Sequence, residues 1–217
     1  MVCRAGSVHS WGHCHHHKFE ETAIKHTSLQ IIRDEHSSLA AMLRSMTMMV
    51  ERGPGENPEQ FFDVLRAMLF YIDEFPERLH HPKESDLLFP RVVRAAPSVM
   101  AAVQRLESDH MNGEKAVREL QHLLLAWELL GEPRRPAFVA QCKKYVDFYL
   151  DHMRLEETEI LPVAEKVLTD AEWKELDAAF EKNCDPLTGK YPPDPAYDRL
   201  FTRIVMRAPA PIGLGDA

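Results

Sequence analysis

The fold is decided by the stretch Leu79-His80-His81-Pro82-Lys83-Glu84-Ser85-Asp86-Leu87-Leu88-Phe89-Pro90, which sets an imidazole and a carboxylate four residues apart in an apolar helical pattern. On a helix, residues at i and i+4 lie on one face about 6 Å apart, so His80 and Glu84 could together hold one metal ion or a pair of ions. The same arrangement recurs in Asp151-His152-Met153-Arg154-Leu155-Glu156, again followed by an apolar and proline element, Ile160-Leu161-Pro162. Two copies are much harder to attribute to chance than one.

Composition indicates one ordinary globular domain. The chain has 217 residues, 45% of them hydrophobic and 28% charged, which is enough for one well-buried core. It carries 26 basic and 34 acidic residues, a net charge of −8, and no basic stripe, so we do not expect nucleic acid as a partner. No apolar run approaches the roughly 18 to 20 residues that span a bilayer, and the N-terminus has no apolar signal region. We therefore expect no membrane partner and a cytoplasmic location.

Cysteines and histidines are distributed unusually. The four cysteines are scattered without a C-x-x-C pair and are expected to be reduced thiols: Cys3, Cys14, Cys142 and Cys184. Twelve histidines are many for this length. Residues 1–23 lack a sustained period and are expected to form a mobile leader. Its tract His13-Cys14-His15-His16-His17 could capture metal, or it belongs to an extension without a defined site.

Apolar residues at helical spacing predict four long amphipathic helices, over about residues 24–51, 58–88, 97–130 and 136–166. Pro76 and Pro82 predict an irregularity near His80, because each removes an N–H and crowds the carbonyl four residues earlier. The run Thr169-Asp170-Ala171-Glu172 predicts the cap of a short fifth helix that ends near Asn183. Residues 184–217 form a proline-rich, irregular tail with a short docking piece at about 197–206. The predicted class is all-α, an antiparallel four-helix bundle over residues 24–183.

Each of the four helices carries one histidine on its predicted inner stripe, and three carry a glutamate one turn later. This set comprises His36, His80, Glu84, His110, Glu114, His152 and Glu156. His36 alone would also suit a hydrogen-bonded core histidine. Buried carboxylates without inward lysine or arginine would repel one another, and two cations would resolve that conflict. Nitrogen and oxygen donors without cysteine fit iron, with manganese or zinc possible. Gly113 lies alongside and would allow a neighbour to approach closely.

The order His36, His80-x-x-x-Glu84 with Leu-Phe-Pro, His110, and His152-x-x-x-Glu156 resembles the hemerythrin-like (HHE cation-binding) domain family over residues 24–180. The resemblance implies a bundle that holds a non-haem, oxo- or hydroxo-bridged pair of iron ions. It implies that Glu84 and Glu156 bridge both ions, with His36 and His80 on one ion and His110 and His152 on the other. Glu114 stands where oxygen carriers of the family have a histidine, which would favour ferric iron and weaken reversible O2 carriage.

Three functions follow from this pattern. The first is a di-iron protein that reacts with O2, peroxide or nitric oxide in sensing, scavenging or an iron-linked stress response. The second is a di-iron peroxidase- or catalase-like enzyme in which Tyr145 or Tyr149, one and two turns before His152, joins the redox chemistry; core packing also explains both tyrosines. The third is a metal-stabilised interaction module whose tail binds a protein partner. The expected small-molecule partner is a diatomic gas or a peroxide.

Overall fold

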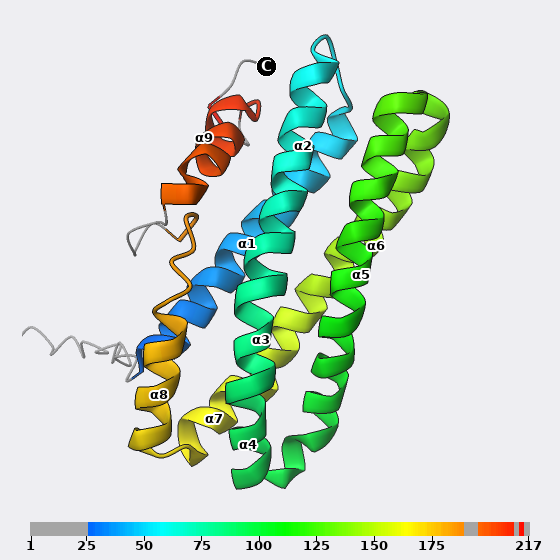
Figure 1. Cartoon of the computed structure of the whole chain (residues 1–217). Coiled ribbons are helices and arrows are strands. Elements are labelled where there is room, and N and C mark those ends of the chain that lie inside the picture. The colour runs from blue at the N-terminus through cyan, green and yellow to red at the C-terminus, as the bar shows by residue number, and fades with distance from the viewer. Residues whose placement is uncertain (1–25, 189–194, 211–212, 215–217) are drawn as a thin grey trace, which may run out of the picture.

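The computed structural model describes residues 26–188, 195–210 and 213–214, and these are arranged in an all-α fold. The predicted leader, residues 1–23, lies outside the described residues. The long helical segments lie side by side along the length of the molecule (Figure 1). The chain rises through α1 (Thr27–Arg52), descends from α2 (Pro58–Ile72) to α4 (Phe89–Ala95), rises through α5 (Met100–Leu130) and descends through α6 (Arg135–Leu155) and α7 (Leu161–Val167) (Figure 1).

The first connection follows from local chemistry. Helix α1 (Thr27–Arg52) ends at Gly53, whose φ of 76° lies in the left-handed region that favours glycine. Helix α2 (Pro58–Ile72) begins with proline, and the side chain of Asn57 accepts a hydrogen bond from the backbone N–H of Gln60. A proline in the first turn and an asparagine cap are both typical helix starts.

The second segment continues without a break beyond α2, but its hydrogen-bond register changes. It contains α3 (His81–Lys83), α4 (Phe89–Ala95) and two stretches of π-helix, η1 (Asp73–His80) and η2 (Glu84–Leu88). Pro76 lies inside η1, so the irregularity predicted near His80 is confirmed. Pro90 cannot donate to the carbonyl of Asp86 within η2, which helps to explain the wider turn there.

The same feature recurs at the second His-x-x-x-Glu motif. A short 3₁₀ turn, η3 (Pro97–Val99), leads into α5 (Met100–Leu130), and another, η4 (Glu132–Arg134), leads into α6 (Arg135–Leu155). The π-helix η5 (Glu156–Ile160) then joins α6 to α7 (Leu161–Val167), whose second residue is Pro162. Each motif therefore has its glutamate at the first residue of a π-helix, and a proline follows six residues later.

Two further helices pack on the outside of the four segments. The capping box predicted at Thr169 is confirmed: its hydroxyl accepts from the N–H of Glu172, and Glu172 accepts from the N–H of Thr169 at the start of α8 (Asp170–Phe180). After the 3₁₀ turn η6 (Pro195–Tyr197), α9 (Asp198–Arg207) lies beside α2 (Figure 1). Its Ile204 is buried, and Arg207 pairs with Asp63 at 2.6 Å.

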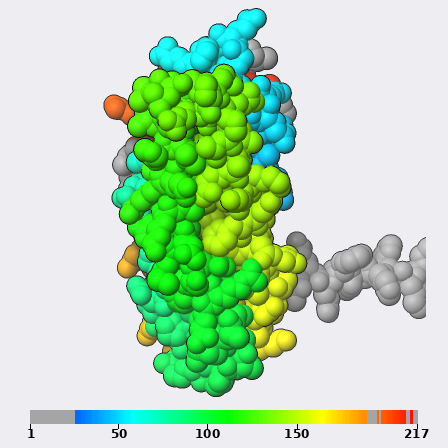
Figure 2. Space-filling view, turned by 90° about the vertical axis from the view of Figure 1, so that its right-hand side faces the viewer, coloured from blue at the N-terminus to red at the C-terminus, as the bar shows by residue number. Residues whose placement is uncertain are grey.

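Buried apolar side chains form two clusters with a band of buried polar groups between them. The upper cluster includes Leu43, Leu65, Leu124, Trp127 and Phe138. The lower cluster includes Leu29, Phe89, Leu106, Leu161 and Trp173. Helices α5 and α6 close one side of this core, with their side chains packed together along the visible face (Figure 2). Within the described part of the chain, no helix has the length and apolar character needed to cross a membrane.

Candidate metal centre

Six of the seven residues predicted to bind metal meet in the polar band. They form two groups whose ligand atoms lie within 4.8 Å of one another: His36, His80, Glu84 and Glu156 in one group, and Glu84, His110, His152 and Glu156 in the other. Glu84 and Glu156 belong to both groups. The structure thus brings the histidines together in the same two pairs that the family resemblance implies, with the same two carboxylates between them.

The imidazole Nε2 atoms point at the shared carboxylates. The Nε2 of His80 lies 3.0 Å from Oε1 of Glu84, and the Nε2 of His36 lies 3.1 Å from Oε2 of Glu156. On the other side, the Nε2 of His152 lies 3.4 Å from Oε1 of Glu156, and the Nε2 of His110 lies 3.5 Å from Oε2 of Glu84. Four nitrogens from four helical segments therefore converge on two carboxylates.

Several of these inward atoms are buried without a hydrogen bond of suitable geometry. They are Nε2 of His80, His110 and His152 and all four carboxylate oxygens of Glu84 and Glu156. Burying such groups unsatisfied costs on the order of 1–3 kcal/mol each. Among the described residues no lysine or arginine is buried, whereas Glu35, Asp73, Glu77, Glu84, Glu156 and Asp185 are. The donor set therefore fits cations, which would satisfy the lone pairs and supply the positive charge.

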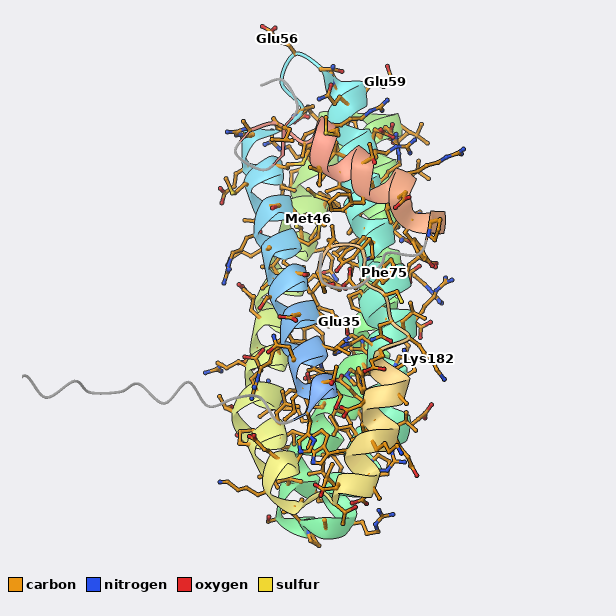
Figure 3. The ribbon with its side chains drawn as sticks, turned by 90° about the vertical axis from the view of Figure 1, so that its left-hand side faces the viewer. Glu35, Met46, Glu56, Glu59, Phe75 and Lys182 are labelled. Atoms are coloured by element: carbon orange, nitrogen blue, oxygen red, sulfur yellow. The ribbon has the colours of Figure 1, made fainter. Side chains whose placement is uncertain are left out.

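In the first group, the outer ring nitrogens of the histidines also have partners. The Nδ1 of His36 lies 3.0 Å from Oε1 of Glu157. The Nδ1 of His80 lies 2.6 Å from Oε2 of Glu35, which also accepts a 2.9 Å hydrogen bond from Nδ2 of Asn183. Glu35 lies on α1 and faces the chain that follows α8 (Figure 3). Outer carboxylates of this kind select the tautomer that leaves Nε2 free to bind metal.

In the second group, the outer partners come from α5 and η2. The Nδ1 of His110 lies 2.9 Å from the hydroxyl of Ser85, which donates to Glu107 at 3.0 Å. The Nδ1 of His152 lies 3.6 Å from Oδ2 of Asp109, a longer contact. The Nδ1 atoms of His36, His80 and His110 are thus held from behind, as in metal-ligating histidines generally, whereas Nδ1 of His152 has no hydrogen bond of suitable geometry.

Without a metal, the site holds protons. Burial lowers the pKa of His152, but Glu156 and Asp109 outweigh burial and raise the pKa to about 10. The pKa of His80 lies well above its usual value, because Glu84 and Glu35 outweigh burial. Burial raises the pKa of Glu156, but His152 and His36 outweigh burial and hold this pKa well below its usual value. A cation entering the site would displace imidazole protons, so binding should release them.

Glu114 is not part of this site, and the prediction that it lies on the inner stripe is wrong. Its side chain is 51% exposed and pairs with Arg118 at 2.6 Å. The buried stripe of α5 runs through His110, Gly113 and Val117. A helix turns about 100° per residue, so both i+3 and i+4 lie near His110, and here the inward position is i+3. Because Glu114 lies outside the site, it gives no reason to expect weakened reversible O2 carriage.

Gly113 has the role expected from its missing side chain. A Cβ atom at this position would lie 1.9 Å from the hydroxyl oxygen of Tyr149 and 2.8 Å from its Cζ. Tyr149 and Tyr145 are buried and both donate hydrogen bonds to Oε1 of Glu77, from Tyr145 at 3.2 Å. Burial raises the pKa of Glu77 to about 7 although both hydroxyls act against it.

Several buried or half-buried groups around the site were not predicted. Glu35 on α1 is only 7% exposed, and Glu157 contacts His36. His81, which belongs to the quoted motif, is only 4% exposed and its Nδ1 lies 3.2 Å from Oε2 of Glu77. A single helical stripe cannot reveal these residues, because each meets a neighbour that another turn or another helix supplies.

A small cavity of about 10 Å³ adjoins the first group. Its lining includes His36, His80 and His81 together with the apolar side chains of Leu39 and Phe75. This volume is close to the least that holds one water-sized molecule. The cavity therefore offers a partly apolar space beside the convergent histidines.

Comparison with known proteins bears on this arrangement directly. A search of curated proteins finds no match to the chain. The family model described as the hemerythrin HHE cation-binding domain matches residues 27–164. The match contains all four histidines and both shared glutamates of the two groups, and it covers more than half of the chain. The chain belongs to the hemerythrin HHE cation-binding domain family.

Proposed function

We propose that this protein is a non-haem di-iron protein that reacts with O2, peroxide or nitric oxide, in sensing, scavenging or an iron-linked stress response. The observation that carries the proposal is the pair of buried four-residue groups that share Glu84 and Glu156. Two groups that share both carboxylates suit two adjacent ions better than one. The proposal includes an antiparallel four-helix bundle around the ions and a cytoplasmic setting.

Iron is the proposed metal because of the donor types. Each group offers two imidazoles and two carboxylates and no thiolate, a set that suits iron and accommodates manganese or zinc. Bound iron would supply the electron-transfer chemistry toward O2, peroxide or nitric oxide. The residues of this chain hold the imidazoles of His36, His80 and His110 in one orientation and exclude water with the apolar clusters above and below.

The cavity beside His36 and His80 supports a small reactant. Its volume of about 10 Å³ is close to the least that holds one water-sized molecule, so it excludes a larger organic substrate from this space. Leu39 and Phe75 make part of its wall apolar, which favours an uncharged diatomic molecule over bulk water. We therefore propose that the reactant reaches the metal from the side of α1 and η1.

Anaerobic reconstitution tests the proposal. The metal-free protein would be titrated with Fe²⁺, its iron content measured by mass spectrometry, and its visible spectrum recorded before and after O2, peroxide or nitric oxide is added. We expect about two irons per chain and new absorption bands with at least one of the three reactants. Full iron loading with no spectral response to any reactant would contradict the proposed reactivity, and stoichiometric zinc that iron does not replace would contradict the metal.

The two buried tyrosines favour a second candidate, a peroxidase- or catalase-like enzyme. The ring centroid of Tyr149 lies 5.6 Å from that of His152, and its hydroxyl donates to Glu77. A tyrosine with a carboxylate acceptor can transfer a proton when an electron leaves the ring. Steady-state peroxide turnover by the iron-loaded protein, reduced at least tenfold in Tyr149→Phe with iron content unchanged, would support this candidate. Turnover that persists without iron would contradict it.

A further inference from the structure

His81 has an environment that the proposed function does not use. It follows His80 directly but points to the other side of the site, toward α5 and α6. Its ring stacks on His110 with centroids 4.2 Å apart and planes 13° apart, and it meets His152 edge-on with centroids 5.5 Å apart. Its side chain is buried among the histidines of the second group although it comes from the turn that supplies the first.

The ring nitrogens of His81 are placed for two different contacts. The Nδ1 atom lies 3.2 Å from Oε2 of Glu77. One ligand atom each of His81, His110 and His152 lies within 4.8 Å of the other two, a third cluster that could hold an ion. Because Nδ1 is engaged by Glu77, Nε2 is the atom left for a metal. His36 and His80 show the same division, with a carboxylate behind Nδ1 and Nε2 free to bind.

The second group already combines two histidines, His110 and His152, with the two shared carboxylates. The position one turn after His110, occupied by Glu114, lies at the surface and supplies nothing to the site. We propose that His81 is a seventh protein ligand, bound through Nε2 to the same ion as His110 and His152. The proposal rests on the two-ion site of the proposed function. It makes the two ions inequivalent, with two histidines on one and three on the other.

The carboxylate of Glu77 is held in turn, which fixes the orientation of His81. Its Oε1 accepts from the hydroxyls of Tyr145 and Tyr149, so Oε2 is directed to His81. Tyr149 also stacks on His81, with centroids 5.6 Å apart and planes 5° apart. Gly113 leaves the space that Tyr149 fills. These contacts hold the imidazole ring of His81 in one orientation, as the partners behind a metal-bound histidine do.

Removing the imidazole while keeping the aromatic ring tests this assignment. His81→Phe retains a ring that can stack on His110 and Tyr149 but has no nitrogen. His122→Phe, at an exposed histidine of α5, is the matched control. Each full-length protein would be titrated anaerobically with Fe²⁺ and with Co²⁺, and bound metal would be counted after dialysis. We expect wild type and His122→Phe to bind two ions, and His81→Phe to bind one ion as wild type does and the second at least tenfold more weakly.

Two ions bound by His81→Phe with wild-type affinity and an unchanged Co²⁺ spectrum would overturn the assignment and leave His81 as a packing residue. Fewer than two ions in the wild type would overturn the two-ion site itself, so the two failures are distinguishable. If His81→Phe does not fold, nitrogen NMR of the zinc-loaded wild type decides. We expect Nε2 of five buried histidines, His81 included, to shift on zinc binding; a shift in only four, without His81, contradicts the assignment.

Discussion

At the scale of single residues, Glu84 and Glu114 differ in burial although each follows a histidine by one helical turn. Glu84 is fully buried between four imidazoles, whereas Glu114 is exposed and paired with Arg118. A surface ion pair of this kind contributes about 0–1 kcal/mol. Their sequence contexts are alike, and only the phase of each helix against its neighbours separates them.

Substituting these two glutamates should therefore have unequal effects on metal binding. We expect Glu84→Gln to weaken metal binding by more than about tenfold. Loss of a residue that only supports a metal ligand already costs about tenfold, and Glu84 is proposed to be a ligand itself. We expect Glu114→Gln to bind two ions with wild-type affinity. Metal content after equilibrium dialysis measures both. A loss of metal in Glu114→Gln equal to that in Glu84→Gln would mean that the exposed carboxylate reaches the site after all.

A second prediction at this scale concerns Gly113. Gly113→Ala would force a Cβ against the ring of Tyr149, and overpacking of this kind costs about 1–3 kcal/mol of unfolding free energy. Urea denaturation measures the change. In Gly113→Ala, adding Tyr149→Phe removes the closest atom and should recover part of the loss. Asn112→Ala, at the exposed neighbouring position, should change stability by less than about 0.5 kcal/mol. Equal losses in the two alanine variants would contradict the close contact.

At the scale of elements, the prolines and caps explain why the helices begin, end and change register where they do. The sequence predicted the break between residues 51 and 58, the cap at Thr169 and the irregularity near His80, because each depends on residues close in the chain. It did not predict that both motif glutamates begin π-helices. The inner face of α5 was misjudged by one position, since i+3 and i+4 are both compatible with an apolar stripe.

The cap of α8 carries an element-scale prediction. Thr169→Ala removes the hydroxyl that accepts from the N–H of Glu172, and loss of such a cap costs about 0.5–2 kcal/mol. Thr47→Ala is a suitable control, because the hydroxyl of Thr47 bonds only to the carbonyl of Leu43 within α1 and alanine favours the helix. Chemical denaturation should show a lower midpoint for Thr169→Ala alone. A midpoint lowered equally by Thr47→Ala would point to a general effect of losing a threonine.

At the scale of the whole molecule, the polar band divides the core into two apolar clusters. When no metal is bound, the stability of the folded protein depends on the protons that the histidines of this band hold. The folded pKa of His152 is about 10, and those of His36 and His80 are also raised, against about 6.5 in the unfolded chain. The folded protein thus binds more protons above pH 6.5, so these histidines contribute stability that is present below pH 6.5 and lost as the pH rises toward 10. The pKa values of His81 and His110 are lowered, so these two histidines change the stability only below pH 6.5, where the unfolded chain binds more protons than the folded protein.

We therefore expect the metal-free protein to lose on the order of a few kcal/mol of unfolding free energy between pH 6.5 and 10, at about 1.4 kcal/mol per pKa unit. The metal-loaded protein should be free of this loss, because metal-bound imidazoles are already deprotonated. It should also be more stable, by about 2.7 kcal/mol when free metal is 100 times the dissociation constant. Thermal unfolding across this pH range, with and without a chelator, measures both. A metal-free protein that becomes more stable as the pH rises would contradict the protonated site.

The sequence by itself determined the all-α class, the four inward histidines and the glutamates 84 and 156, because helical periodicity and proline and glycine signals are properties of neighbouring residues. Only the tertiary structure decided that Glu114 lies outside, that Glu35 and Glu157 stand behind the histidines, and that His81 turns toward His110 and His152. The reason is physical: a side chain's partners depend on the rotation and approach of helices that are distant in sequence. Gly113 shows this most clearly, since the sequence around it does not reveal that Tyr149, from another helix, fills the space that a side chain at position 113 would occupy.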